Sequence, residues 1–196
     1  MILKRLRAIK PEIRVLGIDD GKFVPHSRGQ VPVVGVVFRG GYWLDGVIST
    51  TVTVDGLDAT SKISQMVTCS SHCRQLRVIM LHGVTFGGFN VVDIQKLSSQ
   101  TGLPVIVVNQ KHPCLSEVHS ALANLPNSEE RWQAILNAGE LFEVTAKLGK
   151  HRLYLEVAGI SKNLAQEIIL LTSTRSNIPE ALRVAHLVAS GITRLE

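Results

Sequence analysis

The amino-acid sequence predicts an α/β protein with a mixed sheet, in which three antiparallel strands precede parallel strands and helices cover both faces. Two observations support this fold class. Val, Ile, Leu and Ala dominate a chain that is 45% hydrophobic and only 5% aromatic, which suits a buried sheet. Beyond the third apolar run, strand-like and helix-like segments alternate, which implies a parallel half to the sheet. A length of 196 residues suits one domain over 1–196.

The three expected antiparallel strands lie near the start of the chain. Residues 15–21 form an apolar run that ends in two adjacent carboxylates and a glycine, a pattern typical of a buried strand. After a polar loop, residues 31–39 and 42–54 are rich in Val, Ile and Thr, and a glycine pair between them is a hairpin signal. These segments predict the second and third strands.

Helices and strands alternate beyond the third strand. Asp58 is the expected N-cap of a helix that continues towards Cys73, because its carboxylate can accept the unpaired amide hydrogens of the first turn. Residues 76–81 predict a fourth strand. The next helix is expected to start near Asn90, and residues 104–108 predict a fifth strand.

The second half of the chain is expected to be mostly helical. Its predicted helices cover residues 116–124, 128–146, 161–171 and 179–190, the last with a proline in its first turn. Residues 152–157 predict one more strand. This order of elements is the layout of an RNase H-like fold, which binds ligands at one end of its central strands.

The charge of the chain is compatible with a phosphate-bearing partner. The net charge is +5, and five of the residues 1–14 are basic, a composition that can attract phosphates but also suits a solvated tail. The low aromatic content argues against a platform that stacks single-stranded bases. No apolar run has the length of a membrane span, and the N-terminus lacks the apolar core of a signal peptide. We therefore expect a soluble cytoplasmic protein.

The cysteines are too few and too irregular for a disulfide framework. Cys69 and Cys73 are four residues apart, so they share a face if they lie on a helix, and Cys114 stands alone. A zinc site completed by His72, His112 and Cys114 is one alternative, but its spacing matches no standard zinc module. Free and mostly buried thiols are the favoured interpretation.

Candidate metal ligands gather at the expected ends of the central strands. If the first and fourth strands are parallel neighbours, Asp19 and His82 meet at one edge of the sheet. A carboxylate at the end of a buried strand is costly unless it has a partner, and a divalent cation is one such partner. The candidate ligand set is Asp19, Asp20, Asp55, Asp58 and His82, around Mg²⁺ or Mn²⁺ that would activate water and stabilise charge on a phosphate.

Each candidate has a structural alternative. Asp19 and Asp20 precede a glycine, which is also good turn chemistry. Asp58 suits an N-cap better than a metal site, and a histidine such as His82 is a poorer ligand than oxygen for Mg²⁺ or Mn²⁺. Lys111 could direct its charge at a scissile phosphate, but an exposed loop lysine is the commoner case.

A glycine-rich loop follows the fourth strand. Gly83, Thr85 and Asn90 are its candidate substrate-binding residues, because glycines let a backbone approach a phosphate and a helix N-terminus favours an anion. No Gly-Lys-Ser/Thr follows, so this is not a Walker loop. A tight strand-to-helix crossover whose two phenylalanines pack in the core is an equal alternative.

Several of these segments resemble endonuclease V. Residues 15–21 are similar to its first-strand motif Gly-Val-Asp-Val-Ser, and Asp19 corresponds to the metal-binding aspartate of that motif. Residues 78–108 resemble its Leu-Val-Asp-Gly-His-Gly strand and the loop, helix and strand that follow. Residues 178–186 resemble its C-terminal Leu-Pro-Glu-Pro…Arg-Leu-Ala-His segment.

The resemblance is closer to a mainly archaeal family, the "domain of unknown function ninety-nine", which is a relative of endonuclease V. Residues 15–21, 51–60 and 83–93 carry it, and it covers most of the chain. It implies an RNase H-like, endonuclease V-like fold.

Some endonuclease V residues have no counterpart. The position of its second metal-binding aspartate is occupied by His82 in this chain, and its catalytic glutamate has no counterpart among residues 61–64. Its Pro-Tyr-Ile-Pro wedge is not seen around residues 53–56. Its His-Pro-Arg loop becomes Gly-Phe-Asn at 88–90, and a late Gly-His becomes Gly-Ile at 159–160. One of three expected carboxylates stands in place, which gives no support to cleavage directed at inosine.

Three functional hypotheses follow. The first is a divergent nuclease of DNA or RNA that uses Mg²⁺ or Mn²⁺, with Asp19 and Asp20 as ligands beside Asp55 or Asp58, and Lys111 for charge stabilisation. The second is a non-catalytic nucleic-acid-binding protein that kept the fold and lost the metal site. The third is an enzyme on another substrate whose glycine-rich loop holds a phosphate or small ligand.

Overall fold

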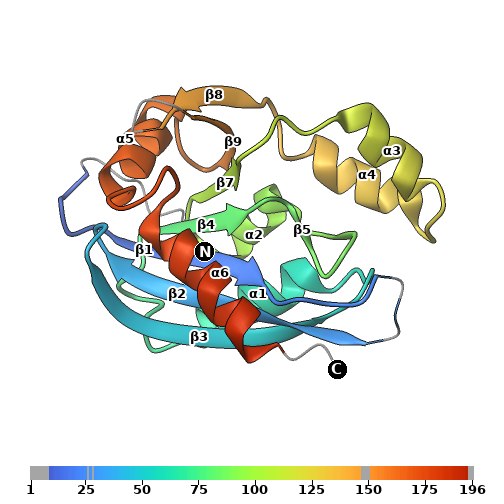
Figure 1. Ribbon diagram of the computed structural model, residues 1–196, viewed down its shortest axis with the longest axis horizontal. Helices are drawn as coiled ribbons and strands as arrows, with labels where there is room; N and C mark the ends of the chain where they lie inside the picture. Colours follow the sequence, from blue (N-terminus) through green and yellow to red (C-terminus); the bar gives the residue numbers. More distant parts are fainter. Residues whose placement is uncertain (1–8, 26, 28, 147–150, 194–196) are drawn as a thin grey trace.

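A seven-stranded mixed sheet forms the centre of the computed structural model, which describes residues 9–25, 27, 29–146 and 151–193 (Figure 1). Of the basic segment 1–14, residues 1–8 lie outside the described residues. The strands are ordered β3-β2-β1-β4-β7-β9-β8. They are β1 (Arg14–Asp20), β2 (Gln30–Arg39), β3 (Trp43–Thr53), β4 (Val78–His82), β7 (Val105–Asn109), β8 (Phe142–Thr145) and β9 (Arg152–Ala158).

The pairing of these strands confirms the predicted mixed sheet. β1 runs antiparallel to β2 on one side and parallel to β4 on the other, and β4 runs parallel to β7. β9 pairs antiparallel with both β7 and β8. The predicted first strand is therefore central, and the carboxyl ends of β1, β4 and β7 share one edge of the sheet.

Helices cover both faces of the sheet, as predicted. α1 and α2 pack on one face, whereas α5 and α6 pack on the other, and α3 and α4 form a hairpin that stands out from the sheet near β5 (Figure 1). No helix in the described part of the chain combines the length and apolar character needed to cross a bilayer. The helices are α1 (Ala59–Thr68), α2 (Ile94–Thr101), α3 (Leu115–Leu122), α4 (Ser128–Leu136), α5 (Lys162–Thr172) and α6 (Glu180–Ile192).

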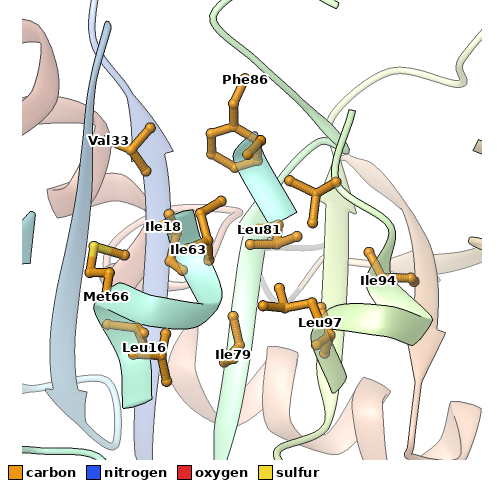
Figure 2. Packing of buried hydrophobic residues seen from close by; sticks show 14 of the residues in the cluster. Leu16, Ile18, Val33, Ile63, Met66, Ile79, Leu81, Phe86, Ile94 and Leu97 are labelled. Atoms are coloured by element: carbon orange, nitrogen blue, oxygen red, sulfur yellow. The ribbon is translucent and has the colours of Figure 1, made fainter. Parts of the chain in front are cut away.

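Side chains along the central strands point alternately to the two faces of the sheet, so the hydrophobic core has one part on each face. Leu16 of β1 and Ile79 of β4 project towards Ile63 of α1 and Leu97 of α2, and all four are fully buried (Figure 2). Val15, one residue earlier in β1, belongs to the cluster beneath α5 and α6. The same alternation therefore sends consecutive side chains at the end of β1 to opposite faces.

Two predicted helices are wrong in their extent. No helix starts at Asn90: β5 (Thr85–Phe86) and β6 (Asn90–Val91) form a small hairpin, and α2 begins only at Ile94. Asp93 is the N-cap there, because its carboxylate accepts a hydrogen bond from the amide of Lys96 at 2.9 Å. Strands of two residues are too short to show the alternation of apolar and polar residues that predicts a strand, so the sequence did not reveal this hairpin.

The predicted helix over residues 128–146 is also too long. α4 ends at Leu136, and β8 takes up residues 142–145 as an edge strand beside β9. Gly139, with a φ of 85°, lies between them in a backbone conformation that other residues rarely adopt, so the helix stops before it.

The expectation of mostly buried thiols is wrong for two of the three cysteines. Cys69 and Cys114 are exposed, Cys73 is half-buried, and none of them forms a disulfide. Within residues 9–193 as the structure describes them, the one group of side chains suited to a metal ion contains no cysteine. The zinc alternative therefore has no support.

Helix α6 lies directly on β1 because Gly17 has no side chain. A Cβ at Gly17 would come within 2.3 Å of the carbonyl carbon of Ala181 in α6. Such a distance requires the helix or the strand to move, so Gly17 sets the separation between α6 and β1.

We predict that Gly17→Ala lowers the free energy of unfolding by about 1–3 kcal/mol, since overpacking forces the backbone to shift. Gly191→Ala is the matched control. Gly191 lies in α6 with nothing within 4 Å of the added Cβ, so this change should raise stability by about 0.5–1 kcal/mol. Urea unfolding of both variants provides the measurement, and a neutral Gly17→Ala would contradict the close packing.

Candidate metal centre

Three side chains from distant parts of the chain meet at the carboxyl end of β1. Asp19 Oδ2 lies 2.9 Å from His82 Nδ1, at the end of β4, and 2.9 Å from His186 Nδ1, on α6. Asp19 exposes only 4% of its surface, whereas His82 is half-buried and His186 is exposed. The meeting of Asp19 and His82 confirms the geometric expectation drawn from parallel neighbouring strands.

His186 is a member that the sequence interpretation did not place in the site. Small apolar residues of α6 pack against β1, and Ala185 is fully buried in that contact. His186 follows it and emerges at the rim of the sheet, 167 positions from Asp19. The similarity of residues 178–186 to a C-terminal segment of endonuclease V, which ends in a histidine, was the signal that could have found it.

Hydrogen bonds hold the Asp19 and His82 side chains in place. The Asp20 amide donates to Asp19 Oδ1 at 3.0 Å, which leaves Oδ2 for the two imidazoles. Gln110 Nε2 lies 3.2 Å from His82 Nε2. The hydrogen bond to Asp19 raises the pKa of His82, because the carboxylate stabilises the imidazolium.

These donor atoms are suitably spaced for a metal ion. The candidate ligand atoms of Asp19, His82 and His186 all lie within 4.8 Å of one another. Ligands at right angles around an ion with bonds of about 2.1 Å lie about 3 Å apart, close to the two distances observed here. Two imidazole nitrogens and one carboxylate oxygen suit Mn²⁺ or Zn²⁺ better than Mg²⁺.

Asp20 is not a member of this group. It follows Asp19 in the strand and therefore points to the opposite face, where Oδ2 accepts a hydrogen bond from the Gly87 amide at 2.6 Å. Burial raises the pKa of Asp20 to about 6. The structure thus uses Asp20 to attach the β5–β6 hairpin to β1.

Asp55 and Asp58 also bond within the protein, away from the three metal-binding candidates. Asp55, with a φ of 49°, accepts a hydrogen bond from the Phe89 amide at 2.8 Å. Asp58 Oδ1 accepts from the Thr53 amide at 3.1 Å and from Asn90 Nδ2 at 2.6 Å. Burial opposes ionisation of Asp58, but these hydrogen bonds outweigh it and lower its pKa. Both carboxylates therefore organise the turn before α1.

The expected N-cap contact of Asp58 is replaced by one from Asn90. Asp58 occupies the N-cap position of α1 but makes no side-chain cap hydrogen bond. The amide of Ala59 donates instead to Asn90 Oδ1 at 2.9 Å. Asn90 is fully buried, and its amide group bonds to Thr53, Asp58 and Ala59. Because Asn90 is buried and these bonds occupy its side chain, it supports the structure and does not face a substrate.

A buried arginine, which the sequence interpretation missed, completes this network. Arg131 of α4 exposes 2% of its surface and donates to the backbone carbonyls of Asp55 at 2.6 Å, Gly56 at 2.7 Å and Phe89. Burial lowers its pKa. Arg131 thus ties the α3–α4 hairpin to the turn before α1 and to the glycine-rich loop. No pattern in the sequence distinguishes it from a surface arginine of an amphipathic helix.

Of the remaining candidates, Gly83 and Thr85 lie near the three-residue group, and Lys111 lies at the surface. Gly83 directly follows His82 with a φ of 77°, and Thr85 lies in β5. Both line a pocket next to the group. Lys111 is exposed, two residues beyond the end of β7.

The fold defines the class of the protein. Its mixed sheet, with a carboxylate and an imidazole at the ends of two central parallel strands, is RNase H-like. Endonuclease V of Ciona intestinalis, solved in complex with DNA containing an inosine followed by a ribo-adenosine, shares this fold with a TM-score of 0.57 and 14% identity. The match covers 88% of this chain and 82% of that one.

The chain belongs to the endonuclease dU family, whose sequence model matches residues 11–193. A UPF0215 protein of Methanothermobacter thermautotrophicus is 54% identical over 188 residues, which cover 95% of this chain and 91% of that protein. The crystal structure of a protein of unknown function from Archaeoglobus fulgidus has a TM-score of 0.83 and 38% identity, with 93% and 99% coverage. The family and fold inferred from the sequence are confirmed.

We predict that Asp20→Asn stabilises the metal-free protein at pH 8 by about 1–3 kcal/mol and has little effect at pH 4. The folded-state pKa of Asp20, about 6, exceeds its ordinary value of 3.8, so ionisation is penalised in the folded state and stability falls as pH rises between them. Urea unfolding in EDTA measures the effect. Asp58→Asn should have the opposite sign at pH 8, because the pKa of Asp58 is lowered. Destabilisation by Asp20→Asn at pH 8 would contradict this assignment.

Proposed function

We propose that the protein is a metal-dependent endonuclease that hydrolyses phosphodiester bonds in nucleic acid at the edge formed by β1, β4 and α6. The observation that supports this most directly is the convergence of Asp19, His82 and His186, because these residues offer a carboxylate and two imidazoles within reach of one ion. RNase H-like proteins bind ligands at this edge. The description of the family, endonuclease dU, favours nucleic acid that contains deoxyuridine as the substrate.

Asp19, His82 and His186 would hold the metal ion, and the ion would supply a Lewis acid that activates water and stabilises charge on the phosphate. The protein residues have separable tasks. Asp19 is fixed by the Asp20 amide, and Gln110 orients His82. Lys111, exposed beyond the end of β7, would attract the phosphate backbone. Asp20 keeps the β5–β6 hairpin beside the site.

One observation favours a second candidate, a nucleic-acid-binding protein without hydrolytic activity. The two imidazoles already satisfy Asp19 Oδ2 by hydrogen bonds of 2.9 Å, so the buried carboxylate has partners without a metal ion. Metal binding and cleavage, measured separately, distinguish this candidate from the nuclease.

We predict that Asp19→Asn and His186→Ala each weaken Mn²⁺ binding by at least about 100-fold, because the first replaces a charged ligand by a neutral one and the second removes a ligand. Nicking of supercoiled plasmid that contains deoxyuridine, in Mn²⁺, should fall to background in both variants. Titration calorimetry and gel assays provide the two measurements. His151→Ala, at an exposed position before β9, is the matched control and should retain both properties. Full nicking by Asp19→Asn would exclude the proposed site.

We also predict that Mn²⁺ affinity rises with pH between 6 and 8. The pKa of His82 is raised by its hydrogen bond to Asp19, and the imidazole must lose its proton before it can bind metal. Below that pKa the affinity should increase by up to about tenfold per pH unit. Calorimetry in buffers of different ionisation enthalpy would detect the released proton. An affinity independent of pH would mean that His82 is not a ligand.

A further inference from the structure

A pocket with one polar side lies beside the candidate metal centre, and metal binding does not involve the residues that line it. The pocket, of about 160 Å³, opens between the turn after β4 and the α3–α4 hairpin. Its walls are apolar, with Phe89, Leu115, Val118 and Ile135, whereas Asn109 and Glu156 give it a polar side. A neighbouring pocket of about 250 Å³ shares Leu115, Ile135 and Glu156 with it.

Glu156 is an unusual residue for such a place. It lies in the middle of β9, opposite Val107 of β7, and exposes only 7% of its surface. Asn109 Nδ2 donates to Glu156 Oε2 at 3.3 Å, which is a long hydrogen bond. Burial raises the pKa of Glu156, and the hydrogen bond from Asn109 opposes this effect. The carboxyl group of Glu156 offers acceptor oxygens, and the amide group of Asn109 offers both donors and an acceptor.

The pocket and the metal-binding group are joined through two strand ends. Gly83 of the pocket directly follows His82, and Asn109 of the pocket directly precedes Gln110, which contacts His82. A molecule whose phosphate lies at the metal centre therefore has this pocket beside it. The exposed side chain of Leu115 at the pocket extends its apolar surface towards solvent.

These features match the chemistry of a nucleobase. An extrahelical base is held between apolar or aromatic side chains and is recognised by hydrogen bonds to its Watson–Crick edge. The walls from α3, α4 and Phe89 can supply the apolar contacts, and Asn109 with Glu156 can supply the donor and acceptor. No lysine or arginine is among the residues that line this pocket, so it offers a phosphate group no opposite charge.

We propose that this pocket binds a single unpaired nucleobase of the nucleic acid substrate, with Glu156 and Asn109 forming hydrogen bonds to the edge of the base. This inference deepens the proposed endonuclease function and rests on it for the nature of the ligand. It assigns Glu156 to base recognition and leaves the reacting phosphate to Asp19, His82 and His186.

The test compares two DNA duplexes that differ at one nucleotide, which is a deoxyuridine in the first and an abasic site in the second. Affinities are measured by fluorescence anisotropy in EDTA, so that cleavage is not needed. Glu156→Ala should weaken binding of the deoxyuridine duplex by about tenfold, a loss typical of one buried hydrogen-bonded contact, and leave the abasic duplex unchanged. Glu156→Gln, which keeps the shape of the side chain and an acceptor oxygen, should remain within about threefold of the unmodified protein.

Glu167→Ala is the matched control, because Glu167 is an exposed glutamate of α5 outside the pocket, and both affinities should be unchanged. Equal losses on the two duplexes in Glu156→Ala, or no loss on either, would overturn the proposal. Thermal melting of Glu156→Gln identifies a folding defect. If nicking in Mn²⁺ is absent while the base-dependent difference persists, the nuclease proposal fails and the pocket proposal stands; the reverse result rejects the pocket alone.

Discussion

The parallel pairing of β1 with β4 determines where the polar residues of this protein lie. It brings the carboxyl ends of the two strands together, so Asp19 and His82 come within 2.9 Å of each other. Strand alternation then directs Asp19 towards α6 and Asp20 towards the β5–β6 hairpin. Gly17 lets α6 lie against β1, and the last member, His186, reaches Asp19 from that helix.

A network of buried polar groups holds the loops around this edge. Asn90 caps α1 from the β5–β6 hairpin, and Arg131 donates to carbonyls of both the hairpin and the turn before α1. Each buried group in this network has a partner, which rigidifies rather than weakens the structure. Asp55 and Asp58 belong to this network, so two carboxylates that suit a metal site in the sequence serve to position the loop beside it.

Much of the fold follows from local sequence patterns, because long apolar runs such as residues 15–18 mark buried strands and their order implies the topology. That topology was sufficient to bring Asp19 to His82. His186 was not predictable from spacing, since the contact spans 167 positions and depends on how α6 crosses the sheet. Arg131 and Glu156 were missed for a related reason: a charged residue is expected at the surface, and only packing reveals it as buried.

Diffraction from crystals soaked in Mn²⁺ tests the central claim most directly, because the anomalous signal locates the ion independently of any activity. We expect one Mn²⁺ peak bonded to Asp19, His82 and His186, and its loss in His186→Ala crystals. A saturating soak that leaves the Asp19 carboxylate hydrogen-bonded to both imidazoles, with no peak between them, would contradict the assignment of this group as a metal centre.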